Sequence, residues 1–129
     1  MPNPKKIKIL LADDEPHIRV LMRTVMESMN AEVVAEAANG EEAVAIYREK
    51  KPDMVFLDIT MPIMDGKTAL KKILAEFPDA CVIMLTSMSA MTTVKECLDA
   101  GAANYIRKDT PINELKRYIK ESWTAFRTG

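Results

Sequence analysis

MVFLDITMPIMDG, residues 54–66, is the segment on which the fold depends. Its first four residues are all apolar, which predicts a short strand buried on both faces of a sheet. The strand ends in a carboxylate, Asp58, and Pro62 cannot continue a ladder of backbone hydrogen bonds. Asp65 and Gly66 are typical of a turn before a helix. A charge at the carboxyl end of a buried strand lies where open α/β sheets have their functional crevice.

The rest of the chain repeats this pattern of an apolar strand followed by a helix. Further short apolar runs predict strands at residues 7–12, 32–37, 80–85 and 103–106, and a helix is expected after each strand. The runs are almost continuously apolar, which favours a parallel sheet covered by helices on both faces. Right-handed crossovers then give an α/β fold, a doubly wound three-layer α/β/α sandwich. This pattern alone leaves the order of the strands open.

Local signals predict where several helices begin and end. Asn39 and Glu42 have the spacing of a capping box at the start of the second helix. Gly101 is expected to end the fourth helix, at about residues 90–100, because glycine adopts the left-handed conformation of a helix terminus at little cost. Thr110 is predicted as the N-cap of the fifth helix, with Pro111 in its first turn.

Length and composition favour a single domain, residues 1–129. The net charge of −1 gives no basic excess for binding nucleic acid or an anionic membrane surface. No apolar run approaches the ~18 residues of a membrane helix, and residues 1–6 lack the apolar core of a signal peptide, so we expect a cytoplasmic protein. The two cysteines, Cys81 and Cys97, are expected as free thiols because they form neither a disulfide framework nor a metal cluster.

Chemically active side chains follow four of the predicted strands. Because parallel strands end at the same edge of a sheet, that edge is expected to bring together five residues: Asp13, Asp14, Asp58, Thr86 and Lys108. Two carboxylates ~4 Å apart repel by about 4 kcal/mol at an effective dielectric constant near 20. A hard divalent cation such as Mg²⁺, with the lysine as a second counter-charge, would relieve this repulsion. A carboxylate beside a metal and a lysine can attack a phosphoryl group and form an acyl phosphate, to whose oxygens Thr86 could donate a hydrogen bond.

Each of these residues also has a simpler explanation when it is taken singly. Acidic residues before a helix complement the positive helix terminus. A threonine or lysine after a strand is often a cap or a solvated charge. Asp58 is harder to explain in this way, since a charge that ends a buried apolar run needs a partner. The coincidence of all five at the carboxyl ends of strands favours a functional site.

Four motifs together resemble the receiver domain of bacterial two-component response regulators, and the resemblance covers the whole chain. They are LADDEP at 11–16, LDITMPIMDG at 57–66, LTS at 85–87 and AGAANYIRK at 100–108. The resemblance implies a flavodoxin-like, five-stranded parallel sheet in the order 2-1-3-4-5, as in single-domain chemotaxis regulators.

The resemblance also assigns a role to the acidic cluster. It implies that Asp58 accepts a phosphoryl group from a histidine kinase or another phosphohistidine donor. It implies that Mg²⁺ is held by the carboxylates of Asp13, Asp14 and Asp58 and by the backbone carbonyl of Thr60. In the family the identity of residue 60 and of Met88 tunes dephosphorylation, so the lifetime of the phosphorylated form is left open.

A switch from the phosphorylated residue to a docking surface is implied as well. Thr86 and Lys108 match the positions that bind the phosphoryl oxygens, and Tyr105 matches an aromatic residue that turns inward on activation. The surface of the fourth helix, fifth strand and fifth helix then changes its preference among downstream target proteins, and we expect the protein itself to be monomeric. Asp109 departs from the family, which usually has a proline, with a cis bond, after this lysine. A cis bond before a non-proline residue costs about 2.5–4 kcal/mol, which favours a trans bond here.

Other functions fit the sequence less well. A flavin-binding protein of the same architecture needs a phosphate-cradling loop after the first strand, where the acidic residues 13–15 would repel a phosphate. An aspartyl-nucleophile phosphatase usually has an acid–base aspartate at position 60, which is threonine here. We therefore expect no enzyme beyond catalysis of its own phosphorylation and dephosphorylation. Chemotaxis signalling to a flagellar motor, a phosphorelay shuttle and a receiver fragment of a transcription factor remain open, although no DNA-reading helix follows residue 127.

Overall fold

Strands and helices alternate along the whole chain. The structure is a computed structural model and describes residues 6–87 and 91–128. Its elements are β1 (Lys8–Ala12), α1 (Pro16–Ser28), β2 (Glu32–Ala37), α2 (Gly40–Lys50), β3 (Met54–Asp58), α3 (Gly66–Glu76), β4 (Val82–Thr86), α4 (Met91–Asp99), β5 (Asn104–Arg107) and α5 (Ile112–Thr128). The predicted strands differ from the observed ones by at most two residues at either end, which is the usual uncertainty of such boundaries.

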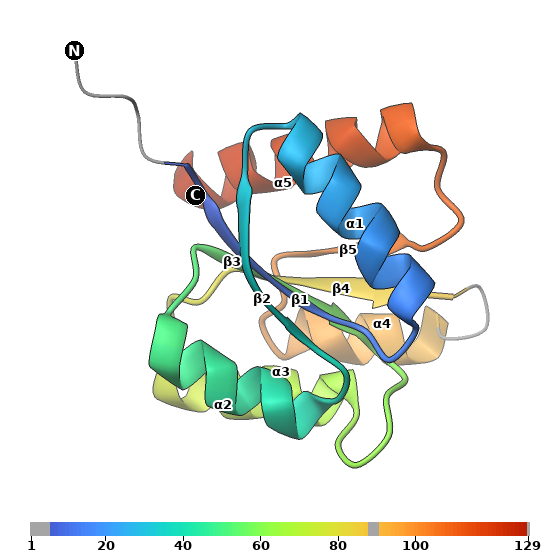
Figure 1. The fold of residues 1–129 in the computed structure, drawn as a ribbon. Coiled ribbons are helices and arrows are strands. Elements are labelled where there is room, and N and C mark those ends of the chain that lie inside the picture. The colour runs from blue at the N-terminus through green and yellow to red at the C-terminus, as the bar shows by residue number, and fades with distance from the viewer. Residues whose placement is uncertain (1–5, 88–90, 129) are drawn as a thin grey trace.

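The five strands form one parallel sheet in the order β2-β1-β3-β4-β5. Helices α1 and α5 cover one face of the sheet, and α2, α3 and α4 cover the other (Figure 1). The predicted fold class and strand order are therefore confirmed. Because all strands run in the same direction, their carboxyl ends and the loops that follow them lie at one edge, on the right-hand side of Figure 1.

The core consists of two hydrophobic clusters on opposite faces of the sheet. Successive side chains of a strand point to opposite faces, so Val55 and Leu57 of β3 join the cluster beneath α2, α3 and α4. Met54 and Phe56 join the cluster beneath α1 and α5. All five residues of β3 are buried, as its uninterrupted apolar sequence predicted. The central strand thus presents its last residue, Asp58, from a rigid and fully packed support.

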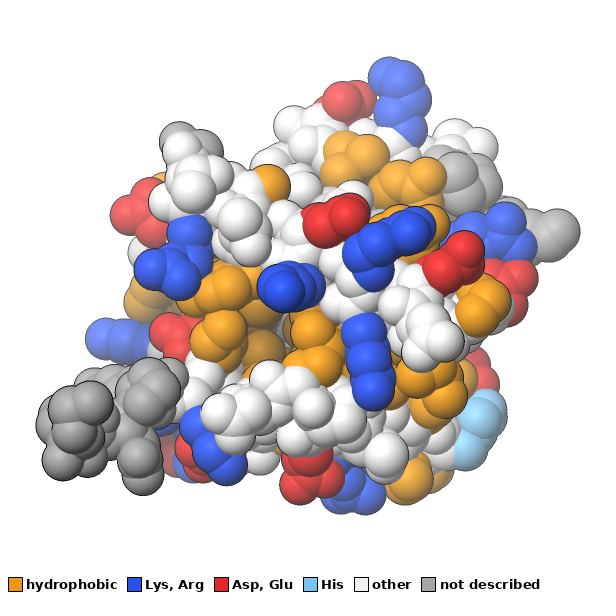
Figure 2. Space-filling view, turned by 90° about the horizontal axis from the view of Figure 1, so that it is seen from above, with side chains coloured by type: hydrophobic (Ala, Val, Ile, Leu, Met, Phe, Trp, Pro, Cys, Tyr) orange, Lys and Arg blue, Asp and Glu red, His pale blue; other side chains and the backbone are white. Residues whose placement is uncertain are grey.

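The face formed by α1 and α5 is mixed in chemistry. Figure 2 shows apolar side chains between lysine and arginine side chains, with acidic side chains interspersed. Among the described residues, no helix is both long enough and apolar enough to cross a lipid bilayer.

Cys81 and Cys97 are both free and buried, as predicted. Burial raises the pKa of the Cys81 thiol to about 12, so this thiol stays protonated and unreactive at neutral pH.

Local capping signals are confirmed at two helices. The side chain of Asn39 accepts a hydrogen bond from the backbone N–H of Glu42 at 2.9 Å. The Glu42 carboxylate accepts a hydrogen bond at 2.8 Å from Ala38, one residue earlier than the reciprocal partner of a capping box. Gly101, with φ of 116°, ends α4, and the Ala102 N–H donates to the Cys97 carbonyl in a Schellman arrangement. Ala90, the predicted first residue of α4, lies outside the described residues.

The predicted start of α5 is one residue too early. The helix begins at Ile112, and the carbonyl of Pro111 accepts the hydrogen bond of Leu115 at 2.8 Å. Pro111 therefore precedes the first helical residue, and Thr110 is not the N-cap. The reason is the turn that follows β5, in which the Thr110 N–H donates to the Arg107 carbonyl at 3.1 Å. Every described peptide bond is trans, including the one between Lys108 and Asp109.

Candidate functional site

The carboxyl edge of the sheet carries a cluster of buried polar side chains. Asp13 follows β1 and is 1% exposed, Asp58 ends β3 and is 3% exposed, and Thr86 ends β4 and is fully buried. Lys108 follows β5 and reaches back to the two aspartates. Its Nζ lies 2.9 Å from Asp13 Oδ2 and 3.1 Å from Asp58 Oδ2. Three predicted site residues from three different strand ends are thus in direct contact.

The backbone of the loops holds these carboxylates in place. Asp13 Oδ1 accepts a hydrogen bond from the N–H of Glu15 at 2.9 Å. Asp58 Oδ1 accepts a hydrogen bond from the N–H of Thr60 at 3.2 Å. Each aspartate therefore has one oxygen held by backbone and the other turned toward Lys108. Thr60 itself is exposed at the rim of the site.

Four carboxylates form a group with the geometry of a metal site. Asp13, Asp14, Glu15 and Asp58 each offer an oxygen, and these oxygens lie within 4.8 Å of one another. Lys108 contacts three of the four residues, including Glu15 at 3.2 Å, but one ammonium offsets only one of four negative charges. The buried oxygens Asp13 Oδ2 and Asp58 Oδ2 accept no well-aligned hydrogen bond from the described residues. An all-oxygen donor set with such excess charge fits a hard divalent cation.

The electrostatics of the site agree with this geometry. Burial raises the pKa of Asp58 to about 7, and the charge of Asp13 adds to this effect, while Lys108 opposes it. Burial acts to lower the pKa of the Lys108 ammonium, but its contacts with Asp13 and Asp58 outweigh burial and hold that pKa above its usual value. The lysine is therefore charged at neutral pH, and Asp58 is readily ionised once another cation is near.

Thr86 and Tyr105 lie close to the site in the fold without joining the cluster. The hydroxyl of Thr86 donates to the carbonyl of Ser87 at 2.8 Å, and the Thr86 carbonyl accepts the backbone N–H of Lys108 at 2.9 Å. Tyr105 is half-buried against the core on the side of α2, α3 and α4. Their predicted roles in phosphoryl binding and switching stay predictions. Met88, which flanks the site in sequence, lies outside the described residues.

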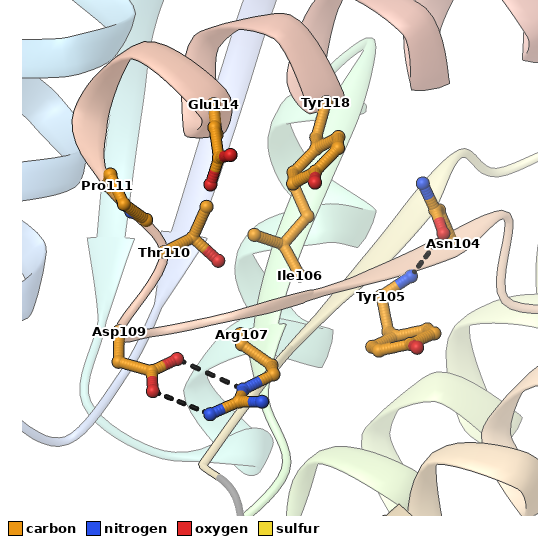
Figure 3. Close-up of a pocket in the computed structure, with 9 residues that line it drawn as sticks. All are labelled: Asn104, Tyr105, Ile106, Arg107, Asp109, Thr110, Pro111, Glu114 and Tyr118. Carbon is orange, nitrogen blue, oxygen red and sulfur yellow. Dashed lines mark hydrogen bonds and ion pairs between the residues drawn. The ribbon is translucent and has the colours of Figure 1, made fainter.

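Asp109, which replaces the usual proline, is bound to a side chain other than Lys108. Arg107 donates to both of its carboxylate oxygens, at 3.0 and 2.6 Å. This pair lies beside a hollow of about 520 Å³ between β5 and the start of α5, to which Tyr118 and Glu114 also contribute (Figure 3). The ring of Tyr105 points away from α5 in this view. The negative charge of Asp109 is thus paired with Arg107 at the edge of this hollow.

Two residues near the site were not predicted as functional. Glu15 belongs to the quoted acidic motif, but only the fold brings its carboxylate to Lys108. Arg19 donates a hydrogen bond to the backbone carbonyl of Asp13 at 2.6 Å. Its position one helical turn after Glu15 is a sequence signal that could have indicated a side chain folding back over this loop.

Comparisons with known proteins agree with this arrangement. Residues 9–120 match the family described as "Response regulator receiver domain". The chain is 45% identical to the chemotaxis protein CheY of Listeria monocytogenes over 79% of this chain and 86% of that protein. It is 44% identical to the uncharacterized transcriptional regulatory protein YhcZ of Bacillus subtilis, of which it spans 51%. Among solved structures, a chain of the CheX–CheY–BeF3–Mg²⁺ complex from Borrelia burgdorferi superposes with a TM-score of 0.84 at 32% identity, covering 89% of this chain and 87% of that one.

Proposed function

Because this chain belongs to the family of response regulator receiver domains, we propose that Asp58 is the residue on which it carries a phosphoryl group. The family defines the role in outline: the chain accepts a phosphoryl group in a two-component system and changes its protein partners in response. The observation that carries the assignment is the position of Asp58 at the end of β3, buried and 3.1 Å from Lys108.

Phosphoryl transfer to Asp58 requires mainly that the reacting groups are positioned and that the charge on the phosphoryl oxygens is stabilised. A carboxylate oxygen of Asp58 attacks the phosphorus of a phosphohistidine, and an O–P bond forms as the N–P bond breaks. The imidazole leaves with the bonding electrons and takes a proton from solvent. The ammonium of Lys108 then follows the negative charge from the carboxylate to the phosphoryl oxygens. Thr86 would rotate its hydroxyl from the Ser87 carbonyl to the same oxygens.

Mg²⁺ is the proposed cofactor. The carboxylates of Asp13, Asp14 and Asp58 and the backbone carbonyl of Thr60 would hold it, with Glu15 as a further carboxylate at the same place. Two observations support this set: all donors are oxygens, and two buried carboxylate oxygens lack an aligned hydrogen bond. The solved complex from Borrelia burgdorferi also contains Mg²⁺ together with BeF3. When bound, the metal neutralises charge on the carboxylates and on the incoming phosphoryl group.

The same proposal implies which proteins bind the unphosphorylated and the phosphorylated chain. The donor is a histidine kinase or another phosphohistidine protein, and the target docks on α4, β5 and α5, where Tyr105 is the proposed switch residue. Several relatives of similar length are named as chemotaxis proteins, which favours a chemotaxis-type role for a monomer acting in the cytoplasm. The match to half of a transcriptional regulator supports the second candidate, the receiver part of a transcription factor. In either case the chain has no enzymatic substrate besides its own phosphoryl group.

Chemical phosphorylation tests the assignment of Asp58. The wild type and Asp58→Asn are incubated with acetyl phosphate and Mg²⁺, and the attached phosphate is measured by intact-protein mass. Asp79→Asn is the matched control because Asp79 is an exposed carboxylate far along the chain from the cluster. We expect one hydroxylamine-sensitive phosphate on the wild type and the control and none on Asp58→Asn, with all three proteins folded. Phosphate retained by Asp58→Asn would assign the acceptor to another residue.

A further inference from the structure

Arg19 connects the first turn of α1 to the acidic loop that follows β1. Its Nη1 donates to the carbonyl oxygen of Asp13 at 2.6 Å, and its Nε donates to Glu36 Oε1 at 3.2 Å. The side chain is only 21% exposed. The other oxygen of Glu36 accepts a hydrogen bond from Arg23 at 2.8 Å. One carboxylate on β2 therefore braces two arginines of α1, and of the two, Arg19 also donates a hydrogen bond to the loop.

Three polar groups of Asp13 form hydrogen bonds, and the fourth, Oδ2, lies beside the ammonium of Lys108. Its N–H donates to the Ala37 carbonyl at 3.0 Å, and its carbonyl accepts from Arg19. Its Oδ1 accepts from the Glu15 N–H, and its Oδ2 faces Lys108. Ala37 and Glu36 are neighbours on β2, so this strand constrains Asp13 directly through its backbone and indirectly through the guanidinium.

This restraint acts on a loop that carries several like charges. Asp13, Asp14 and Glu15 are consecutive carboxylates next to Asp58, and without a metal ion their repulsion, only partly offset by Lys108, favours spreading of the loop. A guanidinium is planar and carries donors in a fixed fork, so it can hold a carbonyl and a carboxylate at once. A lysine ammonium on a flexible stem lacks this fork. The Arg19 hydrogen bond therefore opposes spreading of the loop. Because it binds a backbone carbonyl, it occupies none of the carboxylate oxygens that a metal would use.

We propose that Arg19, braced by Glu36, is a positioning residue for the divalent-cation site, because its hydrogen bond to the Asp13 carbonyl fixes the loop that presents the carboxylates. Arg19 touches neither the metal nor the phosphoryl group. The inference rests on the proposed function, in that it requires these carboxylates to bind Mg²⁺. Removing a hydrogen-bond partner that orients a metal ligand typically weakens metal affinity by about 10- to 100-fold.

Mg²⁺ binding measured without a phosphodonor tests the role of Arg19. The dissociation constant is obtained by calorimetry for the wild type, Arg19→Gln, Arg19→Lys and the control Arg23→Gln, which loses a bond to Glu36 but none to Asp13. We expect about 10-fold weaker Mg²⁺ binding for Arg19→Gln. We expect a smaller loss for Arg19→Lys and a change below about 2-fold for Arg23→Gln. The rate of phosphorylation by acetyl phosphate should return to near the wild-type value in Arg19→Gln at saturating Mg²⁺.

The outcomes separate the positioning role from a purely structural one. Equal losses of Mg²⁺ affinity in Arg19→Gln and Arg23→Gln would overturn the proposal, as would a folded Arg19→Gln that binds Mg²⁺ like the wild type. If Arg19→Gln does not fold, Arg19→Lys decides, and wild-type affinity in that variant would overturn the proposal. A wild type that binds no Mg²⁺ would instead overturn the metal assignment of the proposed function, and the role of Arg19 with it.

Discussion

At the scale of single residues, Asp58 couples the chemistry of the site to the stability of the fold. Its folded pKa of about 7 lies above the ordinary carboxyl value of 3.8. Between these values the folded state holds more protons than the unfolded state, so the contribution of Asp58 to stability is fully present below pH 4 and is lost as the pH rises through 7. Ionised Asp58 is therefore a cost to the metal-free fold at neutral pH.

Asp58→Asn should remove this cost. In metal-free buffer at pH 8 we expect the variant to be more stable than the wild type by about 1 to 3 kcal/mol, given roughly 1.4 kcal/mol per unit of pKa shift and the loss of one partner of Lys108. The difference should shrink toward pH 4, and added Mg²⁺ should reduce it at pH 8. Urea unfolding at a series of pH values measures it. Parallel stability curves for the two proteins would mean that Asp58 has an ordinary pKa.

The residue scale also separates what the sequence could predict from what it could not. Asp13, Asp58 and Lys108 were found because each follows an apolar strand, and parallel strands bring such residues to one edge. Glu15 and Arg19 were not assigned a role because a helix-terminal side chain can point in several directions. In the fold, Glu15 lies beside Lys108, and Arg19 binds Glu36 of β2 and the Asp13 carbonyl. The hydroxyl of Thr86 is bonded to the Ser87 carbonyl, a local competition that spacing along the sequence does not reveal.

At the scale of elements, the turn from β3 to α3 ties the acceptor residue to the packing of a helix. The Gly66 N–H donates to the Ile59 carbonyl at 2.9 Å, so α3 begins directly against the end of β3. A Cβ at position 66 would lie 2.1 Å from the Asp58 carbonyl oxygen and 2.9 Å from its carbon. Neither atom belongs to a flexible side chain, so any side chain at position 66 must push the backbone of the acceptor aside.

Gly66→Ala is therefore expected to damage stability and phosphorylation together. We expect a loss of about 2 to 3 kcal/mol in the free energy of unfolding, the upper part of the roughly 1 to 3 kcal/mol that overpacking of a buried site typically costs. The rate with acetyl phosphate should fall even under conditions in which the variant is fully folded. Lys71→Ala, an exposed change in the same helix, should alter neither quantity by much. A fully active Gly66→Ala would show that the end of β3 can move without harm to the site.

Element boundaries were predictable where the deciding contacts are local. The Asn39 cap and the Gly101 terminus depend on neighbours within five residues, and both were read correctly from the sequence. The start of α5 was misplaced because the turn after β5 holds Thr110 against the Arg107 carbonyl. The order of the strands came from the resemblance to a family, since the alternation of strands and helices fits several orders equally well.

At the scale of the whole molecule, β5 links the acidic cluster to the proposed docking surface. Lys108 follows the last residue of this strand and contacts Asp58, while Tyr105 and Arg107 lie on the strand beside the hollow next to α5 (Figure 3). A phosphoryl group that draws Lys108 and Thr86 toward it must act on the ends of β4 and β5. A tenfold shift between two conformations requires only about 1.4 kcal/mol, which a few charge-assisted hydrogen bonds can provide.

Beryllofluoride, a mimic of the phosphoryl group, tests this link by amide hydrogen exchange. With beryllofluoride and Mg²⁺ we expect exchange to change in peptides that cover residues 104–118, because β5 and the start of α5 adjoin Lys108. Peptides of α2, which packs on α3, β1 and β2, serve as the internal reference and should change little. Asp58→Asn should show neither change. If the response were confined to the loops that carry Asp13 and Asp58, phosphorylation would leave the β5–α5 surface unaltered, and the proposed docking face would have to lie elsewhere on the molecule.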